Sequence, residues 1–276
     1  MIEKRIEIPE SETILSDLDN TLVEGGFNTN CSEIYEVISR IQSNGLKIGL
    51  SSDTPFEALE VWRDRFGMNG PIIAEKGAVV CTESGLSYNK EDSTTFTNTL
   101  ETMINALSVK GFVIWEGNPV EALRMNMRIG NPGDRIALVN NLRKCSIGLF
   151  FRLVGQSGEM RTDQTITRLA MENIRNIYSN LEIDEDYNEN HGLVIIARKG
   201  TNKRTGTQIL MEDEGFKEVG MIGDSMSDYL GSDIAKHFAV QNAADKFKAL
   251  SDYVAKERLT LGVVEILNKL LKTSEE

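Results

Sequence analysis

The sequence contains few of the residues on which several classes of catalytic and metal site depend. Its 276 residues include three cysteines and two histidines. Cys31, Cys81 and Cys145 are widely spaced, which fits neither a disulfide framework nor a CxxC metal or redox motif, so we expect reduced core thiols. Because His191 and His237 are the only histidines, His-rich zinc sites are excluded and a Ser-His-Asp triad has few ways to form. Any chemistry must therefore rest on carboxylates, hydroxyls and lysine.

An excess of positive charge and long apolar runs are also missing. Lys and Arg number 30 against 42 Asp and Glu, which gives a formal net charge of -12. Nucleic acid and anionic membrane surfaces bind proteins with a basic excess, so we expect neither as a partner. No apolar run approaches the roughly 18 to 20 residues of a transmembrane helix, and residues 1–7 lack the apolar stretch of a signal peptide. We therefore expect a soluble, cytoplasmic protein.

The hydrophobic pattern predicts an α/β fold whose core is a Rossmann-like, doubly wound parallel sheet. Apolar runs at 13–16 and 46–50 each end in polar residues and lead into helical periodicity, which is the βαβ pattern of a parallel sheet. Residues 72–81 predict a hairpin instead. The βαβ pattern returns at the end of the chain, with expected strands at 193–197, 219–222 and 238–240, a helix after 203 and a last helix at 259–271.

Residues 83–190 depart from this pattern and predict an inserted α+β module. We expect helices at 94–109, 134–144 and 163–178, with strands near 112 and at 123–129 and 147–154. The predicted organisation is thus a core split into 1–82 and 191–276, with the module at 83–190 between the two parts.

Two carboxylates follow the first expected strand. Alternate residues point to the same side, so Asp17 and Asp19 crowd together at the carboxyl edge of the sheet, where ligands bind in such folds. Either a hard cation such as Mg²⁺ neutralises them or one carboxyl group is held protonated with a raised pKa. Both remedies suit phosphoryl transfer, because an ionised carboxylate can attack phosphorus while a protonated one donates to the departing oxygen. A helix cap would explain one of these carboxylates and not both.

Three other expected elements end or begin with polar residues at the same edge. Gly223 and Asp224 follow a strand, and Asp228 lies four residues further on, which supplies additional cation ligands. Ser52 follows another strand just before a helix, where a hydroxyl and backbone N–H groups favour a phosphate, although a helix cap is the simpler reading. Lys203 follows the expected strand at 193–197 and precedes a helix, so it could reach the edge as a phosphate cation, or it could face solvent.

Two rival motifs do not fit. A calcium loop of EF-hand type opens with Asp-x-Asp but requires Gly at its sixth position, where this chain has Leu22. The segment 223–227 is similar to a nucleophile elbow, but its closing Gly is absent and Asp stands in second place. We therefore keep the phosphoryl-transfer interpretation.

Taken in order, the motifs Asp17-x-Asp19-x-Thr21, Ser52, Lys203 and Gly223-Asp224-x-x-x-Asp228 resemble those of the haloacid dehalogenase-like hydrolase superfamily. The resemblance covers the split core, and the four motifs in sequence are highly specific. The insertion at 83–190 looks like the α+β cap of the subgroup that includes archaeal phosphoglycolate phosphatase, sucrose-phosphate phosphatase, mannosyl-3-phosphoglycerate phosphatase and phosphomannomutase. In that subgroup the cap determines substrate specificity.

The resemblance implies a Mg²⁺-dependent phosphatase for a small phosphorylated metabolite, such as phosphoglycolate or a sugar phosphate. It implies that Asp17 is the nucleophile that forms an aspartyl-phosphate and that Asp19 is the general acid and then the base. The implied phosphate-binding residues are Thr21, Ser52 and Lys203, and the implied metal site consists of Asp17, the backbone carbonyl of Asp19, Asp224 and Asp228, the last supporting the metal or Lys203.

Several positions depart from the subgroup and leave the substrate open. Asp53-Thr54 stands where Gly-Arg is frequent, Arg204 where Gly is common and Ser227 where Asn is common. Two alternatives also remain, a phosphomutase of the same subgroup and a protein that senses phosphate or a sugar phosphate without turnover. The oligomeric state is open as well, a homodimer included.

Three arginines of the inserted module are candidates for binding the remote part of a substrate. If 123–129 is a strand, Arg124, Asn126 and Arg128 share one face. Arg152 lies within an otherwise apolar run, where an arginine needs a reason. Their guanidinium groups would pair with a carboxylate or with sugar hydroxyls, and the simpler alternative is that the face of Arg124 meets solvent.

Overall fold

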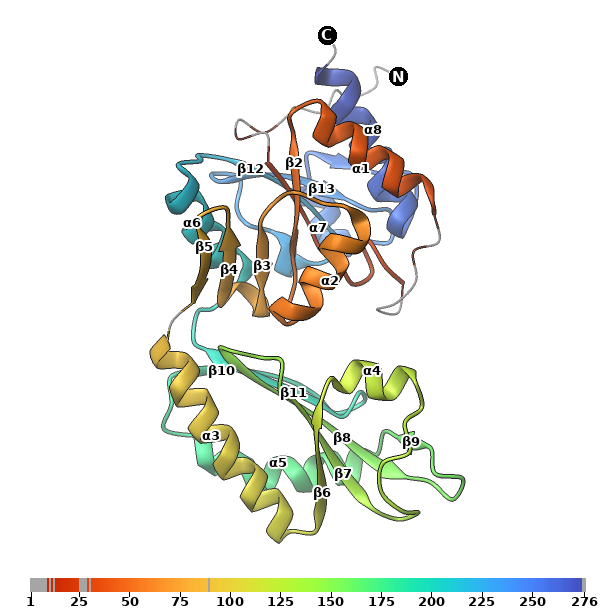
Figure 1. Ribbon diagram of the computed structural model, residues 1–276, viewed down its shortest axis with the longest axis vertical. Helices are drawn as coiled ribbons and strands as arrows, with labels where there is room; N and C mark the ends of the chain where they lie inside the picture. The colour runs from red at the N-terminus through yellow and green to blue at the C-terminus, as the bar shows by residue number, and fades with distance from the viewer. Residues whose placement is uncertain are drawn as a thin grey trace. The chain divides into compact units, whose positions relative to one another are not determined.

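The computed structural model (Figure 1) describes residues 13–24, 31–88 and 90–274 together with residues 9, 11 and 29. Residues 1–7, on which the signal-peptide expectation depends, lie outside the described residues. The chain divides into two compact units, of which unit 1 comprises Met1–Tyr88 and Asn202–Glu276 and unit 2 comprises Asn89–Thr201. Each unit has its own sheet and its own core.

Unit 1 is built on an eight-stranded sheet in the order β14-β13-β12-β1-β2-β3-β4-β5. The strands from β14 to β3 run parallel to their neighbours, and β4 and β5 are antiparallel additions at one edge. The strands are β1(Thr13–Ser16), β2(Lys47–Ser51), β3(Ile72–Ala74), β4(Val79–Thr82), β5(Gly85–Tyr88), β12(Val219–Gly223), β13(Ala235–Ala239) and β14(Tyr253–Val254).

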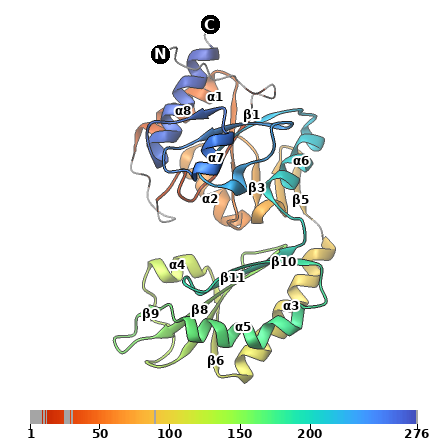
Figure 2. The ribbon, with the colours of Figure 1, turned by 180° about the vertical axis from the view of Figure 1, so that it is seen from behind.

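Helices cover both faces of this sheet. Figure 1 shows α1 and α2 in front of it, and Figure 2 shows α7 in front of the opposite face. Every residue of β1 and of β12 is buried, as expected for central strands of a parallel sheet with covered faces. The helices and short 3₁₀ turns are α1(Glu33–Ser43), α2(Phe56–Phe66), η1(Glu75–Gly77), α6(Lys203–Glu214), η2(Met226–Asp228), α7(Asp245–Leu250) and α8(Leu259–Ser274).

Unit 2 contains a second sheet in the order β10-β11-β8-β7-β6, with β9 paired to β8. Helices α3 and α5 pack against one face through a core that includes Met103, Phe151 and Ile174, and α4 packs on the other face through Ala122. The elements are α3(Lys90–Val109), β6(Phe112–Gly117), α4(Pro119–Arg124), β7(Arg135–Asn140), β8(Ser146–Val154), β9(Met160–Arg161), α5(Gln164–Tyr178), β10(Ile183–Asn188) and β11(Leu193–Arg198).

Two of the elements expected in the inserted module are wrong. The segment expected as a helix at 134–144 contains strand β7, which lies between β6 and β8. Its residues 136–140 are all buried, so the alternation that marks a strand is lost. The strand expected at 123–129 is absent, because Asn118 caps α4 by accepting from the Glu121 backbone N–H and Asn126 has φ 48. Arg124, Asn126 and Arg128 therefore do not form one face of a strand.

The expected strand at 193–197 exists, but it does not belong to the core sheet. It is β11, which pairs antiparallel with β10 and β8 in unit 2. A buried strand in an antiparallel sheet and one in a parallel sheet have the same apolar pattern, so sequence periodicity did not separate them. Unit 2 accordingly runs to Thr201 rather than to 190, and β5 extends the sheet of unit 1 as far as Tyr88.

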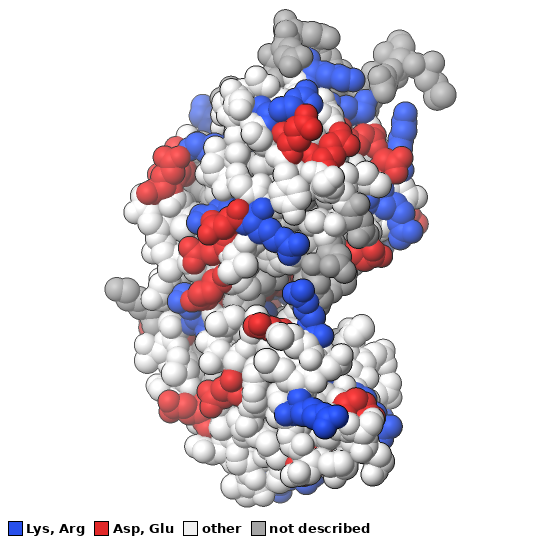
Figure 3. All heavy atoms as spheres, turned by 45° about the vertical axis from the view of Figure 1, so that its right-hand side comes forward, with Lys and Arg blue, Asp and Glu red and all other residues white. Residues whose placement is uncertain are grey.

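The surface and the helices add two observations. Figure 3 shows acidic and basic side chains intermixed over the face that it draws. Within the described part of the chain, a helix that combines the length and the apolar character needed to cross a bilayer is not found.

Candidate active site

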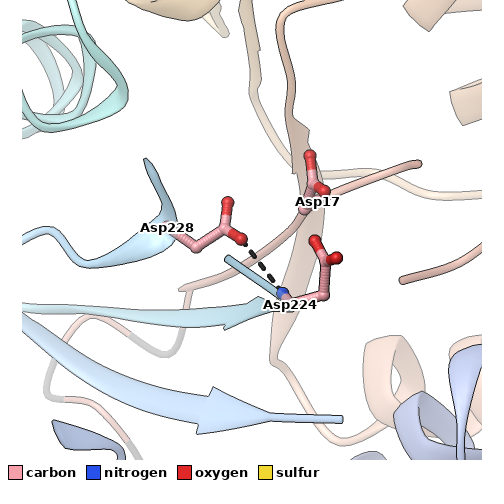
Figure 4. A group of neighbouring side chains, drawn as sticks. All are labelled: Asp17, Asp224 and Asp228. Atoms are coloured by element: carbon pink, nitrogen blue, oxygen red, sulfur yellow. Dashed lines mark hydrogen bonds between the residues drawn. The ribbon is translucent and has the colours of Figure 1, made fainter. Parts of the chain in front are cut away.

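The site in unit 1 begins where β1 ends. The Asp17 backbone N–H donates to the Ile222 carbonyl oxygen at 2.9 Å, which continues the parallel pairing of β1 with β12 by one residue. This pairing brings the ends of the two strands together, and Asp224 follows directly after β12. Figure 4 shows the carboxyl groups of Asp17, Asp224 and Asp228 gathered at this point.

The loop after Asp17 is tightly folded. The Leu18 carbonyl oxygen accepts from the backbone N–H groups of Leu22 and Val23 at 2.9 and 3.0 Å. Asn20 adopts a left-handed conformation with φ 58, and its carbonyl oxygen accepts from the Asn242 side-chain amide at 2.8 Å. This loop leaves Asp19 exposed but buries Thr21 completely.

The buried Thr21 hydroxyl group has an unsatisfied hydrogen-bonding capacity. Its Oγ1 has no hydrogen-bond partner among the residues that the structure describes, and burying a hydroxyl group without a partner costs free energy. A polar ligand would remove that cost. The position of Thr21 two residues after Asp19 makes a phosphate oxygen a suitable partner.

Lys203 is the charged centre of the site. It is 2% exposed, and its Nζ lies 2.6 Å from Asp17 Oδ1 and 2.6 Å from Asp228 Oδ1. Lys203 opens α6, where the Asn202 side chain accepts from the Thr205 backbone N–H at 3.0 Å. The expectation that it follows a strand of the core sheet is wrong, since the preceding strand, β11, belongs to unit 2. The N-terminus of α6 places it instead.

The packing of α6 against η1 keeps Lys203 close to the sheet. A Cβ atom on Gly206 would lie 2.7 Å from the Cα atom of Gly77 and 2.7 Å from Ile73 Cγ2. Only glycine allows this approach without a shift of the backbone. The position of Lys203 therefore depends on the close packing of α6 against η1, and not only on the contacts of the lysine side chain.

Asp228 connects the lysine to the loop after β12. Its side chain is fully buried, and its Oδ2 accepts from the backbone N–H groups of Asp224 and Ser225 at 3.0 and 2.9 Å and from Ser225 Oγ at 3.1 Å. Its other oxygen binds Lys203. Because a Cβ atom on Gly223 would lie 2.4 Å from Asp228 Cβ, this fold of the loop requires the glycine.

Ser52 and Thr54 occupy the end of β2. The Ser52 backbone N–H donates to the Ile73 carbonyl oxygen, and Ser52 Oγ accepts from the Thr54 backbone N–H at 3.2 Å and donates to Thr54 Oγ1 at 3.2 Å. These hydrogen bonds stabilise the turn that contains Ser52, and α2 begins only after this turn, at Phe56. The Thr54 side chain also lies close enough to Asp19 to lower the pKa of its carboxyl group, a contact that the sequence motifs do not predict.

The electrostatics show an excess of negative charge. Burial raises the pKa of Asp17 well above its usual value, with Lys203 opposing this shift and Asp228 adding to it. Burial likewise raises the pKa of Asp224 to about 6, and the Asp228 carboxylate adds to the shift. Loss of solvent around the Asp19 carboxyl group raises its pKa, with Lys203 opposing and Asp53 adding to the effect. One lysine thus compensates only part of the charge.

The carboxyl groups fit a divalent metal ion. Asp17, Asp224 and Asp228 each offer an oxygen atom, and these atoms lie within 4.8 Å of one another. An all-oxygen donor set is the kind that Mg²⁺ prefers, and the uncompensated negative charge would be neutralised by a divalent cation. Asp17 and Asp224 are the better candidates for direct ligands, because both oxygens of Asp228 already accept hydrogen bonds from the protein.

The arginines expected to bind substrate all lie in unit 2. Arg152 is 7% exposed, and its Nη1 donates to the carbonyl oxygens of Phe151, His191 and Gly192 at 2.7, 3.0 and 3.3 Å. Its guanidinium carbon lies 5.6 Å from the centre of the Phe150 ring. Burial lowers its pKa to about 10. These contacts give a structural reason for an arginine in an apolar strand, and substrate binding by Arg124, Arg128 and Arg152 stays a prediction.

Comparison with known proteins identifies similar chains over nearly the whole length. A family model for haloacid dehalogenase-like hydrolases matches residues 14–116. Phosphoglycolate phosphatase 1 of Saccharolobus solfataricus is 24% identical over 265 residues, which is 94% of this chain and 95% of that protein. Phosphoglycolate phosphatase of Sulfolobus acidocaldarius is 22% identical over 263 residues, covering 94% of this chain and 96% of that protein.

The fold is similar to that of solved structures. A haloacid dehalogenase-like hydrolase from Bacteroides thetaiotaomicron superimposes with a TM-score of 0.65 at 18% sequence identity. The match covers 96% of this chain and 100% of the other. At this identity the likeness concerns the fold, and it extends over both units.

Proposed function

This chain is a phosphatase of the haloacid dehalogenase-like hydrolase superfamily, and from that premise we propose that it hydrolyses the phosphomonoester of a small metabolite with Mg²⁺, through an aspartyl-phosphate. The observation that carries the proposal is the placement of Asp17, which is buried at the end of β1 with Lys203 Nζ at 2.6 Å and two further carboxylates nearby. Phosphoglycolate is the first substrate to consider, because both curated relatives that match along the whole chain are named for it. A sugar phosphate is the second.

In the proposed first step, an Asp17 carboxylate oxygen attacks phosphorus and the ester P–O bond breaks. The departing oxygen takes a proton from Asp19, whose raised pKa favours the protonated form that this step needs. Lys203 stabilises the charge on the phosphoryl group and keeps Asp17 oriented. Thr21 Oγ1 and Ser52 Oγ are the proposed hydroxyl donors to the phosphoryl oxygens, and the Ser52 hydroxyl would turn from Thr54 Oγ1 to donate there.

In the second step, water attacks phosphorus and the bond to Asp17 breaks. Asp19, ionised after the first step, accepts the proton of the water, so inorganic phosphate leaves and both carboxyl groups return to their initial states. Asp17, Asp224 and the Asp19 backbone carbonyl would hold Mg²⁺, and Asp228 would support it through Lys203 and the Asp224 backbone. The ion would supply positive charge opposite the carboxylates and the phosphoryl oxygens.

The test is a measurement of inorganic phosphate released from a panel of phosphorylated acids and sugars, with wild type and Asp17→Asn. We expect Mg²⁺-dependent release by wild type and none by the variant, whose circular dichroism should match wild type because the change is isosteric. Equal release by both proteins would contradict the proposal. Isomerised sugar phosphate without released phosphate would point to the phosphomutase alternative, and a stable aspartyl-phosphate without release would point to the sensor.

A further inference from the structure

The chain just beyond Asp228 is held by two side chains that the proposed reaction does not use. Leu230 is completely buried. Its backbone N–H donates to His237 Nε2 at 2.9 Å, and its carbonyl oxygen accepts a hydrogen bond from Arg204 Nη1. His237 belongs to β13 and Arg204 to the first turn of α6. Both polar groups of one residue are thus tied to two different elements of unit 1.

His237 is well fixed as an acceptor. It is 1% exposed, and its ring lies 4.7 Å from that of Tyr229 and 6.2 Å from that of Phe247. Its backbone N–H donates to Asp252 Oδ2 at 2.9 Å, and its carbonyl oxygen accepts from the Asp252 backbone N–H at 2.8 Å. Burial lowers the pKa of the imidazole, so Nε2 keeps the lone pair that the Leu230 N–H requires.

Arg204 is fixed by a second pairing. Its Nη1 and Nη2 donate to the two carboxylate oxygens of Asp233 at 2.8 and 2.7 Å. A guanidinium group that is paired through both of its terminal nitrogens has a fixed plane, so its hydrogen bond to the Leu230 carbonyl oxygen is directional. Arg204 also directly follows Lys203 in the chain, which links the position of Leu230 to the helix turn that carries the lysine.

A displacement of Leu230 would also move Asp228 and thereby change the site. Asp228 is two residues away. One oxygen of its carboxylate accepts a hydrogen bond from Lys203 Nζ, and the other accepts from the backbone N–H groups of Asp224 and Ser225. We propose, resting on the function proposed above, that His237 and Arg204 are positioning residues, which hold Leu230 so that Asp228 keeps Lys203 and Asp224 in place for Mg²⁺ and phosphate. They act through the backbone and touch neither ligand.

The test compares His237→Leu with His237→Gln in the full chain. Both changes remove the ring, but only glutamine offers an oxygen that can accept from the Leu230 N–H. Mg²⁺ affinity is measured by calorimetry without substrate. Groups that hydrogen-bond directly to metal ligands are worth about 10- to 100-fold in affinity. Because His237 acts less directly, through Leu230 and Asp228, we expect the lower end of that range, with Mg²⁺ binding about tenfold more weakly to His237→Leu, whereas His237→Gln should stay near wild type.

Arg204→Met gives a second test that does not depend on a buried substitution, since 35% of the Arg204 side chain is exposed. It should also weaken Mg²⁺ binding, and the double variant with His237→Leu should lose less than the product of the two single fold-losses, because both act on Leu230. The control is Ile38→Val, a buried change in α1, which should lower Tm and leave Mg²⁺ affinity unchanged.

Two results would overturn the proposal. If His237→Leu and Arg204→Met lower Tm but bind Mg²⁺ as tightly as wild type, the two residues are merely structural. A loss of affinity in His237→Gln equal to that in His237→Leu would show that the acceptor is not what matters. Failure of the wild-type protein to bind Mg²⁺ would instead contradict the proposed function itself, and this would be seen before any substitution is made.

Discussion

At the scale of single residues, the acidic groups of the site are held in an environment that disfavours their charge. Asp17, Asp19 and Asp224 all have raised pKa values, with burial as the first cause for Asp17 and Asp224 and loss of solvent around the carboxyl group as the first cause for Asp19. Lys203 moves the other way, because the nearby carboxylates raise its pKa in spite of burial. The site therefore carries a charge imbalance that a divalent cation would relieve, and this imbalance can be measured.

We expect Mg²⁺ to stabilise the protein in a pH-dependent manner. Asp224 has a folded-state pKa of about 6 against a usual value of 3.8, so between these values the folded chain binds a proton that the unfolded chain has lost. Without metal, stability therefore falls as pH rises through this window, and the loss is complete above it. Thermal unfolding should show a Tm increase of a few degrees with Mg²⁺ at pH 7.5 and a much smaller one at pH 5.

Asp224→Asn is the matching variant for that experiment. Its metal-free Tm should depend less on pH between 4 and 6, because the group that gains a charge there has been removed. It should also lose most of the Mg²⁺-induced increase in Tm. An increase of equal size at both pH values in wild type would mean that Asp224 is not a metal ligand.

Asp19→Asn should slow turnover without unfolding the loop that carries it. General acid catalysis typically contributes about 10² to 10⁴ in rate, and its contribution is greatest when the leaving oxygen is a poor leaving group. We therefore expect a large loss of kcat with an alkyl phosphate and a much smaller one with nitrophenyl phosphate. Equal losses with both substrates would indicate that Asp19 does not donate the proton.

Residue-scale sequence reasoning identified the groups that stand at strand ends, and it could not identify those defined by packing. Asp17 and Asp224 follow apolar strands, which is a local signal. His237 lies just before the strand expected at 238–240 and gave no such signal, because its bond to Leu230 depends on how β13 meets the η2 loop. The Thr54 contact with Asp19 likewise depends on the approach of two loops that lie far apart in sequence.

At the scale of elements, close backbone approaches position the functional groups. Gly223 ends β12 with no room for a side chain, because Asp228 folds back over it. We expect Gly223→Ala to displace Asp228 and to abolish most phosphatase activity together with Mg²⁺ binding. Phosphate release and calorimetry would measure the two losses.

Gly67→Ala serves as the matched control. Gly67 ends α2 in a left-handed conformation with φ 66 and has open space around it, so alanine there should cost about 1 kcal/mol of stability through backbone strain alone. Its activity per folded molecule should equal that of wild type. Comparable activity in the Gly223 and Gly67 variants would mean that the loop after β12 tolerates the added methyl group.

Sequence patterns predicted elements well where each had its own periodicity. The amphipathic α5 and the buried β12 follow their expected ranges closely, and the amphipathic α1 lies where helical periodicity was expected. The pattern predicts a helix in place of β7 because burial on both faces leaves no alternation. It predicts a strand at 123–129, where α4 ends and a turn follows, because so short a helix shows no helical period. Tertiary burial, rather than local propensity, decided both cases.

At the scale of the whole molecule, the chain is two units that each bury a core. Unit 2 is one continuous segment, 89–201, with a core formed by α3, α5 and the inner face of its sheet. We expect this segment, produced alone, to fold and to unfold cooperatively in urea, since its core does not draw on unit 1. A gradual, non-cooperative change in circular dichroism would contradict this expectation.

The two-unit organisation was predictable in outline, but its boundaries were not. The expected boundary at 190 placed β11 in the wrong sheet, because a strand's pattern records its burial and not its partners. Unit 1 in turn begins again only at Asn202, directly before the lysine of the site. The insertion therefore enters immediately before a residue of the candidate site, and sequence spacing alone could not show this.

The central place of β1 in its sheet has a consequence for synthesis on the ribosome. β1 can pair with β2 as soon as residue 51 has emerged, but its other edge stays unpaired until β12 has been synthesised. Asp17 and Lys203, which form an ion pair, are likewise separated by 186 residues of chain. At about 5 to 20 residues per second, the nascent protein exposes an unpaired apolar strand for roughly 9 to 34 s. Unit 2 is translated entirely within that interval, so the nascent chain must keep β1 from aggregating until the second half of its own sheet arrives.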